Sequence, residues 1–127
     1  MSRYPCPCCG YIVFDEAGGY EICPICNWED DISQLRFARL AGGANRVSLW
    51  EGQQNYLRYG VSDLRYTQQV RPPQPGDRRD PLWRPLDESA GEIEDPVSGV
   101  EYGPTYPVDN TALYYWRPTF WRRQAAT

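Results

Sequence analysis

The sequence predicts a small α+β fold, in which a metal-held β-hairpin is followed by short helices and then by an extended segment rich in proline and aromatic residues. All five cysteines lie within the first 26 residues of the 127-residue chain. A helix-capping sequence follows near the middle, and nine of the twelve prolines lie in residues 72–127. Because proline cannot continue a helix, we expect residues 1–71 to form a compact module and residues 72–127 an extension.

The cysteines form two similar motifs. The first is CPCCG at residues 6–10, and the second is CPICN at residues 23–27. Two CxxC turns supply the four thiolates that a tetrahedral Zn²⁺ prefers. The residue after each turn often takes a positive φ, which glycine and asparagine adopt most readily. The spacing therefore predicts a zinc ribbon with one Zn²⁺ and four ligands: Cys6, Cys9, Cys23 and Cys26.

Three questions about this site stay open at the level of sequence. Cys8 takes the position that Ile25 has in the second motif, so it is either a small apolar residue packed beneath the site or a thiol with a redox or alternative-ligand role. Iron is the alternative to zinc, because both metals bind four thiolates. A catalytic zinc keeps a position open for water, whereas four thiolates close the shell, which favours a structural metal.

Local patterns predict the secondary structure around the site. Short β-branched and aromatic runs at residues 11–14 and 20–22, joined by a turn, predict the two strands of a hairpin between the cysteine pairs. The sequence SLWE, which begins at Ser48, is a capping box, and it predicts a helix over residues 49–59. Gly52 inside that helix indicates a close approach by another segment.

Fainter patterns predict the remaining elements. Short helices are expected over residues 32–40 and 62–69. Residues 77–96 are expected to be a spacer with few anchors, because prolines interrupt them and aromatic residues are sparse. The run at residues 112–116 suggests one strand.

Composition excludes many enzyme classes. The chain has no histidine and no lysine, and all 13 basic residues are arginine. This excludes catalysis by histidine, Ser–His and Cys–His nucleophile pairs, and Schiff-base lysine. We therefore expect no enzymatic activity.

Charge and hydropathy limit the partners. The net charge is −4, which argues against nonspecific nucleic-acid binding, since that function needs a strongly basic face. The mean hydropathy is −0.68, and no apolar run approaches the ~18 residues of a membrane span. The N-terminus also lacks the apolar segment of a signal peptide. We expect a cytoplasmic protein that does not contact a membrane.

Two groups of residues are candidates for binding a protein partner. Tryptophan, tyrosine and arginine are enriched at interface hot spots, and they gather near the C-terminus; the alternative is that these aromatic residues fold back and form core. An acidic cluster follows the second motif; the alternatives are a second cation site, an acid–base pair, or a solvated turn whose last carboxylate caps the next helix. The candidates are Tyr114, Trp116, Arg117, Trp121, Glu29, Asp30 and Asp31.

The motifs resemble the bacterial cysteine-rich CPCC domain. The resemblance rests on YPCPCCGY at residues 4–11, GYEICPICNWEDD at residues 19–31 and GGANRVSL at residues 42–49, and it covers about residues 3–73. It implies a small, soluble, zinc-binding module, sometimes encoded near polymorphic toxin systems. Residues 74–127 have no recognised counterpart, so the resemblance implies nothing about them.

These observations favour a non-enzymatic protein-binding module, and most specifically a bacterial immunity-type protein that neutralises a toxin. An acidic protein would suit a basic toxin such as a nuclease, through complementary electrostatics. The alternative is a nucleic-acid-binding zinc ribbon. Arg117, Arg122 and Arg123 are interleaved with aromatic residues that could stack on bases, but the acidic total opposes this function.

Overall fold

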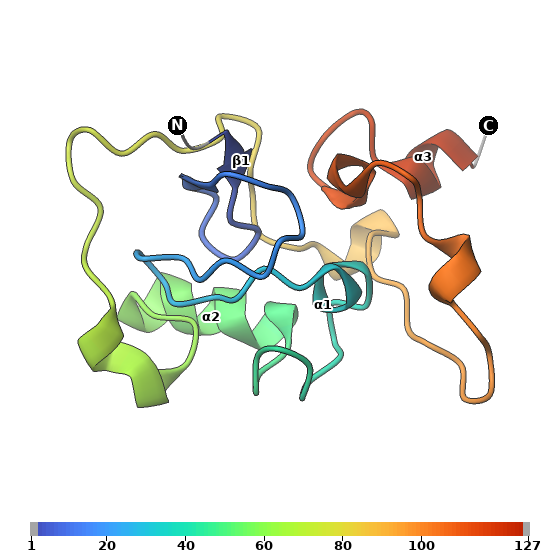
Figure 1. The fold of residues 1–127 in the computed structure, drawn as a ribbon, viewed down its shortest axis with the longest axis horizontal. Coiled ribbons are helices and arrows are strands. Elements are labelled where there is room, and N and C mark those ends of the chain that lie inside the picture. Colours follow the sequence, from blue (N-terminus) through green and yellow to red (C-terminus); the bar gives the residue numbers. More distant parts are fainter. Residues whose placement is uncertain (1–2, 126–127) are drawn as a thin grey trace.

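A two-stranded antiparallel hairpin at the N-terminus is followed by short helices, which confirms the predicted α+β class (Figure 1). The computed structural model describes residues 3–125, and the side chains as far as Arg123. Among the helices of this described part, none is long and apolar enough to cross a membrane. The elements are β1 (Tyr4–Pro5), β2 (Ile12–Phe14), α1 (Ile32–Arg36), α2 (Leu49–Tyr59), η1 (Leu64–Gln69), η2 (Glu88–Ala90), η3 (Gly103–Thr105), η4 (Asn110–Leu113) and α3 (Trp121–Ala125).

The strands of the hairpin differ from those expected. β2 pairs with β1, so the first cysteine turn forms the tip of the hairpin. The other edge of β2 is occupied from far along the chain, since Ile12 N–H donates to the Arg78 carbonyl at 2.8 Å. The expected strand at residues 20–22 does not pair with β2; Ile22 forms an isolated bridge with Glu29 instead. Each cysteine turn therefore closes a hairpin of its own.

The capped helix forms as predicted. The Ser48 hydroxyl accepts from Glu51 N–H at 3.1 Å, and α2 ends at Gly60, whose φ is 78°. The other two expected helices are shorter than predicted. α1 ends at Arg36, because the backbone of Phe37 leaves the helical region. Within the expected range 62–69, the 3₁₀ helix η1 begins only at Leu64, after its cap Asp63.

The C-terminal segment packs into the same core as the cysteines. Leu113, Tyr114, Tyr115, Trp116 and Phe120 are buried there. The strand expected at residues 112–116 does not form, because η4 is a 3₁₀ helix that extends to Leu113 and a turn follows it. The last two residues of the expected extension lie outside the described residues.

A buried arginine ties α1 to this segment. The Arg36 guanidinium pairs with Glu94 at 3.0 Å and donates to the Thr105 hydroxyl at 2.8 Å. It also lies 4.6 Å from the centre of the Tyr106 ring and 4.8 Å from that of Trp121. Such cation–π contacts are strongest where water is excluded, as it is here. One side chain of α1 thus contacts residues between positions 94 and 121.

Candidate metal centre

Both cysteine turns have the backbone that the sequence predicts. In the first turn, Gly10 N–H donates to the Cys6 carbonyl at 2.7 Å, and the φ of Gly10 is 84°. In the second turn, Asn27 N–H donates to the Cys23 carbonyl at 2.8 Å, and the φ of Asn27 is 70°. The two residues expected to adopt a positive φ therefore do so, and each turn directs its two thiols to one side.

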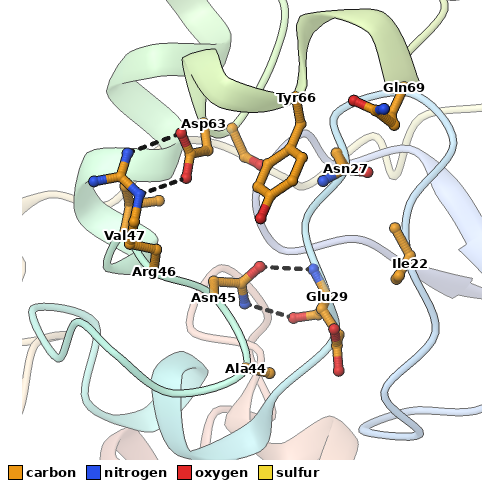
Figure 2. A pocket seen from close by; sticks show the side chains of 11 residues that line it. Ile22, Asn27, Glu29, Ala44, Asn45, Arg46, Val47, Asp63, Tyr66 and Gln69 are labelled. Atoms are coloured by element: carbon orange, nitrogen blue, oxygen red, sulfur yellow. Dashed lines mark hydrogen bonds and ion pairs between the residues drawn. The ribbon is translucent and has the colours of Figure 1, made fainter.

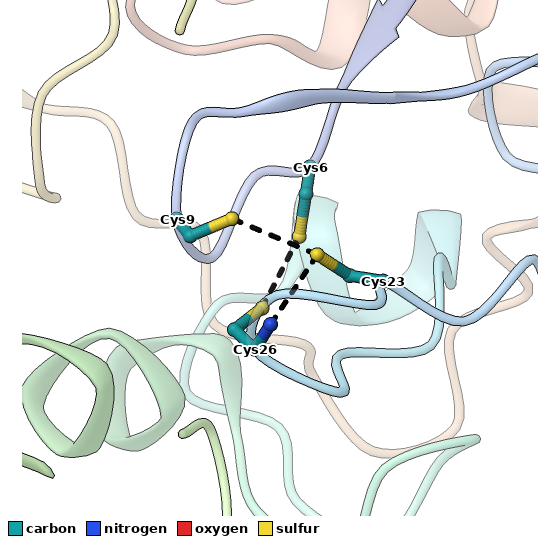
Figure 3. A group of neighbouring side chains, drawn as sticks. All are labelled: Cys6, Cys9, Cys23 and Cys26. Carbon is teal, nitrogen blue, oxygen red and sulfur yellow. Dashed lines mark hydrogen bonds between the residues drawn. The ribbon is translucent and has the colours of Figure 1, made fainter. Parts of the chain in front are cut away.

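The two turns face each other and bring four sulfurs together (Figure 3). The sulfurs lie within 4.8 Å of one another, and all four side chains are buried. Across the turns, Cys6 Sγ lies 3.6 Å from Cys26 Sγ, and Cys9 Sγ lies 3.7 Å from Cys23 Sγ. A tetrahedron with metal–sulfur bonds of about 2.3 Å has edges of about 3.8 Å. The four cysteines predicted from the spacing are thus placed to bind one metal ion.

The charge state of the cluster also favours a bound cation. Burial raises the pKa of Cys6 and of Cys26 well above the ordinary thiol value. Burial opposes ionisation of Cys23 as well, but the hydrogen bonds that Cys23 accepts outweigh it and lower the pKa of this thiol. Among them is the bond from Cys26 N–H, 3.4 Å from Cys23 Sγ (Figure 3). Four buried thiols cannot all ionise unless a metal cation compensates their charge.

Cys8 lies outside the four-sulfur cluster and is buried beneath it. A Cβ atom added to Gly52 would lie 3.4 Å from Cys8 Sγ and 3.2 Å from Trp28 Cζ3. The close approach expected at Gly52 is therefore confirmed. The position supports the interpretation of Cys8 as a small apolar residue that packs between the site and α2.

Residues 4–77 match the family described as Cysteine-rich CPCC. The match includes all five cysteines and covers more than half of the chain. The chain belongs to the Cysteine-rich CPCC family. Comparison with curated proteins finds no match. We call residues 4–77 the CPCC module, and residues 78–123 the tail.

The tail makes hydrogen bonds to the first turn of the CPCC module. Arg79 Nε donates to the Cys9 carbonyl at 2.8 Å, and Trp83 Nε1 donates to the Pro7 carbonyl at 2.9 Å. Asp80 N–H also donates to the Gly10 carbonyl at 2.8 Å. The prediction that residues 77–96 are a spacer with few anchors is wrong, because carbonyls of the cysteine turn accept hydrogen bonds from this segment. Trp83 is the one aromatic residue of residues 77–96, and so the one feature of their sequence that could have indicated this contact.

Gly10 of the CPCC module has no room for a side chain. A Cβ atom there would lie 2.6 Å from the Trp83 ring, and the φ of 84° is itself strained for alanine. Gly42 has a similar φ of 82° but nothing within 4 Å of a Cβ atom, so Gly42→Ala is a matched control. We expect Gly10→Ala to lower the free energy of unfolding by about 1–3 kcal/mol more than Gly42→Ala, because of the added clash. Urea unfolding of both variants measures this; equal losses would contradict the docking of Trp83.

The acidic cluster of the CPCC module points mainly inward. Asp31 caps α1, as one interpretation expected: its Oδ1 accepts from Ser33 N–H at 2.8 Å. Asp30 Oδ2 accepts from Gly18 N–H at 2.7 Å, and both aspartates are buried. They form neither a solvated turn nor a surface patch for a partner, because their carboxylates satisfy backbone N–H groups. Glu29 alone of the three is partly exposed.

Burial gives Asp30 an unusual protonation behaviour. It raises the pKa of Asp30 to about 6, and the nearby Glu21 and Asp31 carboxylates add to this effect. Because the folded-state pKa lies above the unfolded value of about 3.9, the neutral form stabilises the fold at low pH. That contribution is lost as the pH rises through about 6.

We therefore expect Asp30→Asn to be more stable than the wild type at pH 8, by about 2 kcal/mol. The difference should shrink when both proteins are compared at pH 5.5. Urea unfolding at the two pH values, in saturating zinc, measures it, and subtracting the wild type removes the pH dependence of metal binding. An equal difference at both pH values would contradict the raised pKa of Asp30.

The C-terminal residues that the sequence offers as partner contacts are engaged within the protein. Tyr114 and Trp116 are buried and stack with ring centroids 4.8 Å apart. Trp116 Nε1 and Arg117 Nη2 each lie 3.0 Å from Asp80 Oδ2. Trp121 packs against Arg36, as described above. The alternative that these aromatic residues form core is the one the structure supports, because Asp80 gives them a buried polar anchor.

Proposed function

We propose that the chain is a non-enzymatic protein-binding module stabilised by one zinc ion. The observation that carries this proposal is the closed set of four buried thiols. Four thiolates fill a tetrahedral shell and leave no position for water or substrate, so such a metal supports the fold. Zinc binding contributes roughly 10–16 kcal/mol in small zinc-finger peptides, which is enough to decide whether a small module folds.

We further propose that the partner is a basic protein, and that the chain acts as an immunity-type protein that neutralises a toxin. The net charge of −4 supports a basic partner such as a nuclease. The alternative, binding of nucleic acid, requires that the interleaved arginine and aromatic residues near the C-terminus be exposed. Burial of Trp116 and pairing of Arg117 with Asp80 weigh against it. The partner surface is therefore to be sought on the CPCC module.

Affinity capture with the full chain tests the proposal. The chain is immobilised, exposed to lysate from its own source with and without nuclease treatment, and washed at increasing salt. We expect a basic protein to be retained in near-stoichiometric amount and released by salt, because charged contacts are screened. Expressed alone, that protein should arrest growth, and co-expression with this chain should restore it.

Three outcomes would overturn the proposal. Retained nucleic acid in place of protein would favour the alternative. A retained protein that does not affect growth would remove the immunity role. Turnover of nucleic acids, peptides or phosphoesters that survives repurification would contradict the absence of enzymatic activity.

A further inference from the structure

A pocket of about 300 Å³ lies on the CPCC module, and its lining includes Ile22 and Asn27, which flank the second cysteine turn (Figure 2). Its walls come from three stretches that are far apart in the sequence: residues 22–29, 44–47 and 62–69. The volume is at the lower end of the roughly 300–1,000 Å³ typical of ligand pockets. The pocket therefore suits a single long side chain or a small ligand.

Hydrogen bonds that need no ligand hold two walls of the pocket in place. Asn45 Oδ1 accepts from Glu29 N–H at 2.8 Å, and Asn45 Nδ2 donates to the Glu29 carbonyl at 2.8 Å (Figure 2). Arg46 pairs with Asp63 through two bonds of 3.1 and 2.9 Å. This ion pair uses the charge of both partners, so it adds no net charge to the pocket. The walls are thus fixed before a guest binds.

Several polar groups of the pocket remain without a partner among the described residues. No hydrogen bond or ion pair there involves the Glu29 carboxylate, the side-chain amides of Asn27 and Gln69, or the Tyr66 hydroxyl. Figure 2 shows the Tyr66 hydroxyl directed into the space between Asn45 and Asn27. All four groups can accept hydrogen bonds, and the only unpaired charge in the lining is negative.

We propose that this pocket binds an arginine side chain of the protein partner, a step that rests on the proposed function. A guanidinium offers five N–H donors in a plane, which suits a lining with one unpaired carboxylate and several amide and hydroxyl acceptors. Its stem would pack on Ile22 and Tyr66, which are 57% and 37% exposed. Arginine is also among the residues that most often anchor interfaces, so one guest could supply much of the affinity.

The Tyr66 ring has a defined part in this binding. The Arg65 guanidinium already lies 5.8 Å from the centre of the ring. The ring therefore contributes an apolar wall and its hydroxyl, and the negative charge that attracts the guest comes from Glu29. We therefore expect substitution of Glu29 to weaken arginine binding more than substitution of Tyr66.

Short peptides test the chemistry of the pocket directly. The ¹⁵N-labelled full chain is titrated with a capped Gly-Gly-Arg-Gly-Gly peptide, with its citrulline counterpart and with its lysine counterpart, while amide shifts are followed by NMR. We expect the arginine peptide to shift the amides of Glu29, Ala44, Asn45 and Tyr66, and to bind at least tenfold more tightly than the uncharged citrulline peptide. Equal affinity for citrulline or for lysine would overturn the arginine assignment.

A pair of variants isolates the charge. Glu29→Gln should weaken the arginine peptide about tenfold or more, since charge-assisted hydrogen bonds are the strong ones. The fold should persist, because the Glu29 carboxylate makes no internal hydrogen bond, and metal content checks this. Glu88→Gln removes a carboxylate that does not line the pocket, and it should leave the affinity unchanged. Equal affinity of Glu29→Gln and wild type would overturn the proposal.

The captured partner separates this inference from the proposed function. Glu29→Gln should weaken that partner at least tenfold as well. A partner that binds Glu29→Gln as tightly as wild type would overturn the arginine pocket and leave the protein-binding function in place. Arginine-peptide binding without any captured protein would overturn the proposed function and leave the pocket chemistry intact.

Discussion

Replacing Cys23 with serine should release the metal and unfold the protein. The substitution removes one of four buried donors and leaves the remaining thiols without a compensating cation. Metal binding contributes roughly 10–16 kcal/mol in comparable small modules, so its loss is as large as the ~5–15 kcal/mol by which domains are usually stable. We expect metal content near zero and a circular dichroism spectrum without a cooperative thermal transition.

Cys8→Ser is the matched control for this experiment. Cys8 is as buried as Cys23, but it lies outside the four-sulfur cluster. The variant should keep its metal and lose only modest stability, because a hydroxyl replaces a buried thiol of similar size. A Cys23→Ser protein that kept both its metal and its fold would contradict the ligand assignment.

A chain that ends at Asp77 should fail to fold cooperatively even with zinc. The truncation removes Leu113, Tyr114, Tyr115, Trp116 and Phe120 from the core that surrounds the cysteines. Loss of a single buried tryptophan or phenylalanine side chain typically costs about 3–5 kcal/mol. NMR dispersion and urea unfolding in saturating zinc measure the effect. A truncated chain with a sharp transition would show that the CPCC module is independent of the tail.

Two arginine variants test the attachment of the tail to the CPCC module without a truncation. The Arg36 side chain is 3% exposed and pairs with Glu94, whereas the Arg39 side chain is 43% exposed and pairs with Asp95. Arg36→Met leaves the Glu94 carboxylate without its partner and should cost about 3–5 kcal/mol. Arg39→Met should cost less than about 1 kcal/mol, as exposed pairs do. Equal costs would contradict the role of Arg36 in holding the tail.

The metal ligands could be predicted from the sequence because their signal is local. Each turn carries its own proline, its two cysteines and the residue that adopts a positive φ, and the structure forms both as expected. The cap of α2 is local in the same way, since Ser48 and Glu51 are three residues apart. These features depend on backbone geometry over a few residues.

The strand pairing and the tail could not be predicted, because they depend on distant contacts. Residues 11–14 and 20–22 have the composition of two paired strands. The Ile12 N–H, however, donates to the carbonyl of Arg78, which is far along the chain. Aromatic residues are enriched both in cores and at interfaces, so composition does not separate the two. The hydrogen bond from Trp116 to Asp80 places the aromatic residues in the core, and its two residues are 36 positions apart in the sequence.

The acidic residues show the same limit. The sequence offers Asp31 as a helix cap, but it gives no reason to separate Glu29 from Asp30. The structure assigns Asp30 and Asp31 to backbone N–H groups and leaves the Glu29 carboxylate unpaired beside a pocket. Glu29 and Asp30 point to opposite sides, as successive residues of an extended backbone do, whereas Asp31 points inward because it caps α1.

The most direct test of the metal centre is native mass spectrometry of the full chain, with elemental analysis of the same sample. We expect one zinc per chain, retained in Cys8→Ser and lost in Cys6→Ser, Cys9→Ser, Cys23→Ser and Cys26→Ser. Cobalt substitution should give the absorption of a four-thiolate site. Loss of the metal in Cys8→Ser, together with its retention in Cys9→Ser, would contradict this ligand set.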